Sequence, residues 1–229
     1  MATMATMTVT VRLFAMLRER AGRDELDLEL AEGATVADAR AALRDRDGLG
    51  DVLERMPVRA AVNREYVADE TLLSSGDELA LIPPVSGGGD AGTGTAAEPH
   101  VRISAEPLSL DAVARAVLRP SAGAVVTFQG ATRDVDRLEY EAYVEMAERR
   151  IAAILRDCVD RHGLQAAAAE HRVGAVPLGE PSVIVAVSSR HRAEAFAGAR
   201  EAIDRIKAEA PIWKREVEGA QARWVEGSP

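Results

Sequence analysis

Cysteine is almost absent from this chain, because Cys158 is the only one among 229 residues. The chain therefore cannot form an internal disulfide or a zinc site built from several cysteines. It also has no apolar run close to the ~20 residues that a transmembrane helix needs. Residues 1–7 lack the basic and apolar regions of a secretory signal. We therefore expect a cytoplasmic protein that has no membrane anchor.

Lysine is the second scarce residue. Acidic side chains outnumber basic ones, and the net charge of −9 argues against extended binding to nucleic acid phosphates. Among the 28 Lys and Arg residues, only Lys207 and Lys214 are lysines. Arginine cannot replace lysine where an amine must gain and lose a proton. The two lysines are therefore either chance survivors or members of a site that needs titratable amines.

The remaining composition is that of a globular protein, with 47% hydrophobic and 28% charged residues. Residues 86–99 stand apart, since they contain five glycines and no large apolar side chain. Such a segment is typical of a flexible linker. We therefore predict a first domain over 1–85, a glycine-rich tail and linker over 86–99, and a second domain over 100–229.

The first domain has the pattern of a ubiquitin-like β-grasp fold. Thr35 and Asp38 form a capping-box sequence at the start of an amphipathic helix over 36–46. Alternating apolar residues predict strands on both sides of that helix, over 8–14, 25–30, 58–62 and 78–82. Two strands, a helix and two further strands, in that order, indicate the β-grasp arrangement.

The second domain mixes helices and strands, which indicates an α+β fold. We predict helices over 110–118, 145–162 and 193–208, the first of them capped by Ser109. Strands are predicted over 101–103, 124–128, 138–144, 183–187 and 213–217, with a further one at Val173. Cys158 lies on the apolar face of helix 145–162, so we interpret it as a core residue and not as a reactive thiol. His162 and His171 fall in no motif and are expected to be surface or packing residues.

The β-grasp pattern ends in a pair of glycines, Gly87 and Gly88. A tail without side chains is thin enough to enter a narrow channel, and a glycine carboxylate is sterically open to attack by an enzyme. Ubiquitin-like proteins and sulfur carriers share this ending. The alternative is that the two glycines belong only to the linker.

Two sets of sequence motifs resemble those of the molybdopterin synthase family. Residues 8–88 resemble its small, sulfur-carrying subunit, with the ending LIPPVSGG at 81–88. Residues 100–226 resemble its large, catalytic subunit in four motifs: TFQG at 127–130, LEYEAY at 138–143, SRHR at 189–192 and KAEAPIWKRE at 207–216. The chain is thus similar to a fusion of both subunits.

This resemblance implies a fold and an activity. The expected fold is a β-grasp domain followed by an α/β-hammerhead-type catalytic domain. The expected activity is that of a sulfurtransferase, which moves sulfur from a thiocarboxylate on Gly88 to cyclic pyranopterin monophosphate and forms the dithiolene of molybdopterin. No metal or cofactor is implied. The implied partners are an adenylating sulfurtransferase that activates Gly88, and a second copy of the chain in a homodimer formed through the catalytic domain.

The resemblance also implies roles for individual residues. The catalytic positions correspond to Lys207 and Lys214, and the substrate-binding positions to Arg133, His191, Arg192, Arg215 and Glu216. Whether the lysines act as acid and base, form a covalent adduct or only supply charge is left open. Without the resemblance, His191 and Arg192 would be explained as a solvated helix start, and Arg133 as a surface charge.

Two departures from the family pattern affect these expectations. The loop at 134–137 is short, which puts substrate or subunit contacts from it in doubt. Gly88 is joined to Gly89 by an amide, yet a thiocarboxylate forms only on a free carboxyl group. We therefore hypothesise that the chain is cut after Gly88, in a linker accessible to proteases. A rival hypothesis is a ubiquitin-like carrier whose second domain binds a ligand without catalysis.

Overall fold

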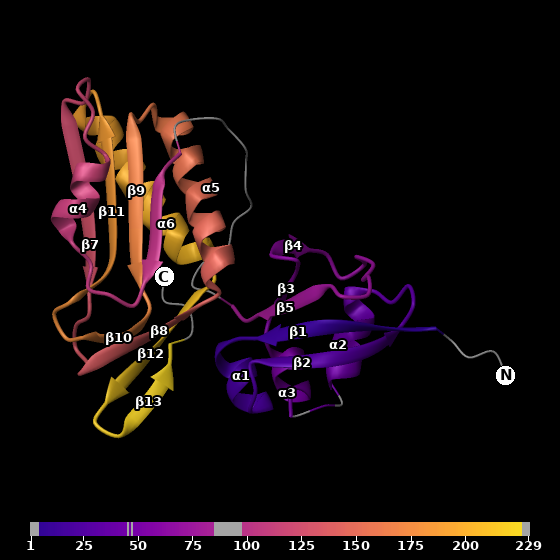
Figure 1. Cartoon of the computed structure of the whole chain (residues 1–229). Helices are drawn as coiled ribbons and strands as arrows, with labels where there is room; N and C mark the ends of the chain where they lie inside the picture. The colour runs from indigo at the N-terminus through magenta and orange to yellow at the C-terminus, as the bar shows by residue number, and fades with distance from the viewer. Residues whose placement is uncertain (1–4, 45, 47, 85–97, 226–229) are drawn as a thin grey trace. The chain divides into compact units, whose positions relative to one another are not determined.

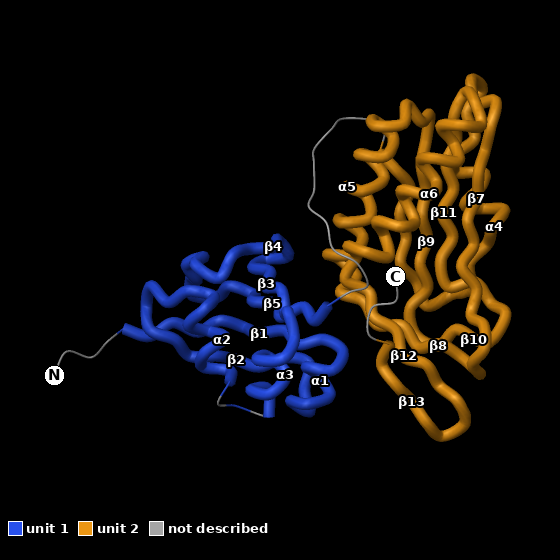
Figure 2. The backbone as a smooth tube through the Cα atoms, turned by 180° about the vertical axis from the view of Figure 1, so that it is seen from behind, with its two compact units in different colours: residues 1–84 blue, residues 85–229 orange. Residues whose placement is uncertain are grey.

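The computed structural model describes residues 5–44, 46, 48–84 and 98–225 of the chain. Contacts within the chain divide it into two compact units, Met1–Pro84 and Val85–Pro229. Figure 1 shows the elements of the chain, and Figure 2 gives each unit its own colour. The predicted domain limits at 85 and 99 border residues outside the described set and stay a prediction. In the described part of the chain, no helix is both long and apolar enough to cross a membrane.

The first unit is built on a five-stranded sheet with the order β2-β1-β5-β3-β4. Its elements are β1 (Thr6–Leu13), α1 (Ala15–Ala21), β2 (Glu25–Ala31), α2 (Val36–Arg44), α3 (Gly50–Arg55), β3 (Arg59–Val62), β4 (Glu65–Val67) and β5 (Glu78–Ile82). Strand β1 runs antiparallel to β2 and parallel to β5. This mixed sheet with α2 packed on it confirms the predicted β-grasp fold.

Every second side chain of β1 points into the core of this unit. Val9, Val11 and Leu13 are buried and share one core with the apolar face of α2. The predicted capping box is confirmed, since the Thr35 backbone N–H donates to Asp38 Oδ2 at 2.8 Å and the Asp38 N–H donates to Thr35 Oγ1 at 3.3 Å. Short helices α1 and α3 were not predicted, because six or seven residues give little helical periodicity.

The second unit contains two four-stranded sheets. The first sheet has the order β6-β9-β11-β7, and the second sheet has the order β10-β8-β12-β13. The elements are β6 (His100–Ser104), α4 (Leu110–Ala116), β7 (Ala124–Ala131), β8 (Arg137–Ala142), α5 (Val144–His162), β9 (Ala166–Arg172), β10 (Gly174–Pro177), β11 (Pro181–Ser189), α6 (Arg192–Glu209), β12 (Ile212–Glu218) and β13 (Gln221–Trp224). This arrangement confirms the α+β prediction.

The first sheet is covered on both faces. Helices α5 and α6 lie against one face and α4 against the other (Figure 1). Strand β11 shows why, since Val183, Val185 and Val187 pack in the core with α5 and α6, whereas Ile184 and Ala186 pack with α4. A strand buried on both faces is a continuous apolar run, as the sequence of β11 shows.

Several local predictions for this unit are confirmed and one is wrong. The Ser109 side chain accepts from the Ala112 N–H at 3.3 Å and caps α4, as predicted. Cys158 is completely buried in the core between α5 and α6. Val173, in contrast, lies between strands β9 and β10 and belongs to neither. Strand β9 begins with four alanines, which favour helix over strand, so its burial and not its propensity makes it a strand.

Candidate functional site

The two lysines lie on consecutive elements at one end of the second unit. Lys207 is in the last turn of α6, and Lys214 is the third residue of β12. The side chain of Lys207 is exposed, and its Nζ atom lies 5.6 Å from the centre of the Phe128 ring on β7. An ammonium group at this distance is attracted by the face of the ring. Phe128 therefore gives Lys207 a fixed neighbour on the first sheet.

Lys214 is half-buried, and its surroundings disfavour its charged form. Burial lowers the pKa of Lys214, and the positive charge of Lys207 lowers it further. Arg133 acts in the same direction, whereas the carboxylate of Glu216 opposes the shift. Lys207, Lys214 and Arg133 therefore form one cationic group, which we call the lysine cluster. An amine in such a group exchanges protons closer to neutrality than an ordinary lysine does.

The loop that carries Arg133 is short and held at both ends. Thr132 is buried, its N–H donates to the Glu180 carbonyl at 3.0 Å, and its carbonyl accepts from the Gly179 N–H at 2.9 Å. At the other end, the Asp136 carboxylate accepts from the Gly219 N–H at 2.8 Å. The Arg133 side chain is 89% exposed and forms a long ion pair, 3.7 Å, with Asp134. This loop therefore presents a guanidinium group that is open to an anion.

Arg215 and Glu216 follow Lys214 on β12 but have partners within the second sheet. Because side chains alternate along a strand, Arg215 points to the opposite face from Lys214 and Glu216. Arg215 donates to Glu139 Oε2 through Nε at 2.7 Å, directly across from it on β8. Hydrogen bonds from Arg137 and Arg215 lower the pKa of Glu139. Glu216 accepts from Arg223 Nη2 at 3.0 Å. The structure thus places Arg215 away from the lysine cluster.

His191 and Arg192 lie at the other end of the same helix. His191 is the N-cap of α6, Arg192 is its first residue, and both side chains are exposed. Lys207 follows Arg192 by 15 positions, which corresponds to about 22 Å along the helix axis. Within one chain, the predicted site residues therefore form two groups, one at each end of α6.

The register of β7 and β11 shows independently that His191 and Arg133 lie far apart. β11 and β7 run antiparallel, and Ser189 of β11 pairs with Ala124 of β7. The loop of Arg133 follows the far end of β7, where Ala131 pairs with Pro181. His191, which follows Ser189, and Arg133 thus lie at opposite ends of these strands.

Two residues beside the lysine cluster were missed by the sequence motifs. Tyr140 on β8 pairs with Lys214 on β12, and its hydroxyl donates to Ser182 Oγ at 3.0 Å. The His171 ring lies edge-on to the Tyr140 ring, with 5.0 Å between the centroids. Tyr140 belongs to the LEYEAY motif at 138–143, which does not by itself indicate a role for this side chain. His171 was expected at the surface or in packing, and the structure buries it.

The protonation of His171 follows from its contacts. Its Nδ1 atom lies 2.8 Å from the Arg172 carbonyl oxygen, which can only accept, so Nδ1 carries the proton. Burial lowers the pKa of His171 to about 4, and the charge of Lys207 contributes in the same direction. His171 is therefore a neutral ring at physiological pH.

Two sequence predictions have no structural description. Gly87 and Gly88, and with them the predicted cleavage point, lie outside the described residues. Among the residues that are described, no group of three or more His, Cys, Asp or Glu side chains could hold a metal ion.

Comparison with known proteins identifies the second unit. Residues 103–209 match the MoaE protein family. Over 140 residues the chain is 41% identical to molybdopterin synthase catalytic subunit 1 of Mycobacterium tuberculosis, a match that covers 58% of this chain and 95% of that protein. The chain belongs to the molybdopterin synthase catalytic subunit family. The rice catalytic subunit is 50% identical over 112 residues, which span 46% of this chain but only 58% of the rice protein.

Solved structures agree with the family assignment. The molybdopterin synthase of Staphylococcus aureus has a TM-score of 0.52 and 34% identity, and the match covers 54% of this chain and 94% of that one. Residues 11–88 match the ThiS family. The chain is therefore a fusion of a ThiS-type unit with a MoaE-type unit. Lys207 falls within the MoaE match, whereas Lys214 lies five residues beyond its end at 209.

Proposed function

We propose that this chain is a fused molybdopterin synthase. It transfers two sulfur atoms, each delivered by a thiocarboxylate on Gly88 that is left as a carboxylate, to cyclic pyranopterin monophosphate and forms the dithiolene of molybdopterin. The observation that carries the proposal is the lysine cluster, where a half-buried Lys214 has its pKa lowered by burial and by the charge of Lys207. Both reactants are anions, because one carries a cyclic phosphate and the other a thiocarboxylate. A site for them needs convergent cations and a group that exchanges protons.

Each member of the cluster has a distinct task in this proposal. Arg133 binds the cyclic phosphate through its exposed guanidinium group, as charge-assisted hydrogen bonds favour. Lys207, held over the Phe128 ring, supplies fixed positive charge to the entering thiocarboxylate and to the phosphate ester as it opens. Lys214 holds or releases a proton during these steps, since its lowered pKa makes the neutral amine more accessible.

The carboxyl group of Gly88 must be freed by cleavage before it can carry sulfur. Sulfur forms a thiocarboxylate only on a free carboxyl group, so cleavage after Gly88 precedes activation. An adenylating sulfurtransferase then activates and sulfurates Gly88, in the cytoplasm. Support for this step comes from the chemistry of the peptide bond and from the ThiS family match, which ends at residue 88.

A second copy of the chain completes the substrate site in this proposal. His191 and Arg192 lie about 22 Å along α6 from Lys207, too far to share one small substrate with it. In a homodimer formed through the catalytic units, the helix start of one copy can meet the lysine cluster of the other. The isologous symmetry of a dimer would then produce two equivalent sites.

The deciding experiment is turnover by cleaved, thiocarboxylated protein supplied with cyclic pyranopterin monophosphate. Lys207→Ala and Lys214→Ala should each abolish most product formation, measured as molybdopterin by chromatography. Arg200→Ala is the matched control, because Arg200 is 86% exposed on the same helix and should leave turnover unchanged. Normal turnover in both lysine variants would overturn the site assignment. Substrate binding without turnover in the unsubstituted protein would instead support the rival, a binding-only second domain.

Intact mass tests the cleavage separately. Protein isolated from its source should contain a fragment that ends at Gly88. Full turnover by a chain that remains uncut would overturn the cleavage step and leave the lysine assignment standing.

A further inference from the structure

The two lysines belong to different layers of the second unit. Lys214 is on β12 in the second sheet, whereas Lys207 is on α6, which packs on the first sheet and places Nζ over Phe128 of β7. The separation of the two amines therefore depends on how the second sheet is held against the first. The contacts that join the two sheets beside the lysines are therefore the ones to consider for the geometry of the lysine cluster.

Tyr140 makes such a contact. Its backbone pairs with Lys214 inside the second sheet, and its hydroxyl donates to Ser182 Oγ of β11, in the first sheet, at 3.0 Å. Ser182 is 4% exposed, and its own hydroxyl donates to the Gly130 carbonyl of β7 at 3.3 Å. The serine thus accepts one hydrogen bond and donates another. A polar connection therefore runs from β8, which pairs with the strand of Lys214, through Ser182 to β7, the strand of Phe128.

The residues around these two hydrogen bonds are closely packed. A Cβ atom on Gly130 would lie 2.8 Å from Val183 Cγ1 and 3.3 Å from Phe128 Cε1, so β7 and β11 are closely packed here. On the other side, the Tyr140 ring rests edge-on against His171, whose Nδ1–H is bound to the Arg172 carbonyl. Tyr140 is therefore in contact with strands β9 and β11 of the first sheet.

We propose that Tyr140 is a positioning residue: its hydrogen bond to Ser182 fixes the strand of Lys214 at its working distance from Lys207. The bond itself does not depend on the reaction, but its consequence for turnover rests on the proposed function. Removal of the hydroxyl leaves a buried serine without its donor and releases the second sheet from the first at this point. Lys214 then gains solvent and loses its close approach to Lys207 and Arg133, while Glu216 stays beside it on β12.

The scarcity of lysine makes this proposal directly measurable. Protein labelled with ε-¹³C-lysine has two lysine signals, from Lys207 and Lys214. In Tyr140→Phe, which removes only the hydroxyl, the Lys214 signal should titrate at a higher pH than in the unsubstituted protein. Ser182→Ala removes the other partner and should give the same shift. Tyr66→Phe, in the first unit, is the matched control and should leave both signals unchanged.

A double-mutant cycle distinguishes the loss of the Tyr140–Ser182 hydrogen bond from a general loosening of the packing between the two sheets. If one hydrogen bond is responsible, Tyr140→Phe with Ser182→Ala should shift the Lys214 titration no further than either single change. Turnover should fall about tenfold in each variant with KM little changed, because misplacement of a group near the reaction lowers kcat. Additive shifts in the double variant, or an unchanged Lys214 titration in Tyr140→Phe, would overturn the proposal.

The two proposals fail in distinguishable ways. An unsubstituted protein without turnover, whose Lys214 titration still responds to Tyr140→Phe, would refute the synthase activity and support the positioning role. Turnover that depends on Lys214 but is equal in Tyr140→Phe and in the unsubstituted protein would refute the positioning role and support the synthase activity.

Discussion

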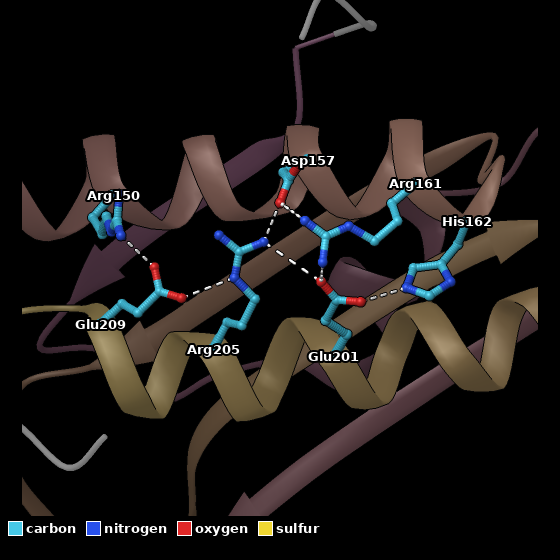
Figure 3. Close-up of polar contacts among 7 residues, drawn as sticks. All are labelled: Arg150, Asp157, Arg161, His162, Glu201, Arg205 and Glu209. Carbon is cyan, nitrogen blue, oxygen red and sulfur yellow. Dashed lines mark hydrogen bonds and ion pairs between the residues drawn. The ribbon is translucent and has the colours of Figure 1, made fainter. Parts of the chain in front are cut away.

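Glu209 and Arg150 form an ion pair that is almost entirely removed from solvent, with side chains 4% and 12% exposed. Glu209 also accepts from Arg205 Nε at 2.8 Å. Figure 3 shows that these contacts begin a row of charges between α5 and α6. The row continues through Asp157, Arg161, Glu201 and His162. Because Glu209 lies two residues after Lys207, the pair fixes the helix end that carries this lysine.

Loss of the Glu209 carboxylate should destabilise the second unit strongly. Glu209→Ala removes the carboxylate that pairs with the nearly buried Arg150 guanidinium, so the free energy of unfolding should fall by about 3 kcal/mol. Both tryptophans, Trp213 and Trp224, lie in this unit, so their fluorescence during urea unfolding reports on it alone. Asp204→Ala, at a position 66% exposed on the same helix, should change stability by less than about 0.5 kcal/mol. Equal effects of the two substitutions would contradict the role of the pair.

Cys158 should resist alkylation in the native protein. Burial raises the pKa of its thiol to about 12, with Glu201 acting in the same direction, so almost no thiolate exists at pH 8. Iodoacetamide at pH 8 should leave the native mass unchanged and should add one label after unfolding in urea. Since Cys158 is the only cysteine, intact mass gives the answer without peptide mapping. Rapid labelling of the folded chain would show that the α5–α6 core opens.

His171 should make the second unit less stable in acid. Its pKa is about 4 in the folded chain and 6.5 ordinarily, so between these values the unfolded chain binds a proton that the folded chain does not. Stability from this residue is therefore present above pH 6.5 and is lost as the pH falls towards 4, by about 3 kcal/mol in total. Tryptophan-monitored unfolding at pH 7 and pH 4.5 measures the loss. In His171→Gln the loss should be smaller, and an identical loss would show that other groups cause it.

The sequence was sufficient for features that depend on local pattern. Apolar alternation located β1 and β5, the Thr35–Asp38 capping box located α2, and the continuous apolar run located β11. The resemblance of the motif at 207–216 assigns Lys207 and Lys214 to one site, and that assignment stays a prediction; in the structure the charge of Lys207 lowers the pKa of Lys214. These are short-range signals, which one segment carries by itself.

Features that depend on partners from distant segments were not predictable. Strand β9 has a helix-favouring alanine run and exists because β6 and β11 pair with it. Tyr140 and His171 meet across two sheets, which no spacing in the chain reveals. The alternation of side chains along a strand does predict that Lys214 and Arg215 lie on opposite faces of β12. The distance between the two ends of α6 likewise follows from the number of residues in the helix.

That distance gives the most direct test of a shared site in a homodimer. A Lys214→Ala chain keeps Arg192, and an Arg192→Ala chain keeps both lysines, so each should be inactive alone. When the two are produced together, random pairing makes about half of the dimers mixed, and each mixed dimer contains one intact site of two. Turnover per site should therefore recover to about a quarter of the unsubstituted value. Purification by two different affinity tags isolates the mixed dimer for the measurement.

A second pairing controls for this recovery. Lys207→Ala and Lys214→Ala lie in the same group at the C-terminal end of α6 and the start of β12, so every site in their mixed dimer lacks one lysine. This combination should recover no turnover. Because a site built within one chain cannot be repaired by any partner, an inactive mixture of Lys214→Ala with Arg192→Ala would show that the two groups do not meet across a dimer. Recovery in that mixture alone would assign the helix start of one copy to the lysine cluster of the other.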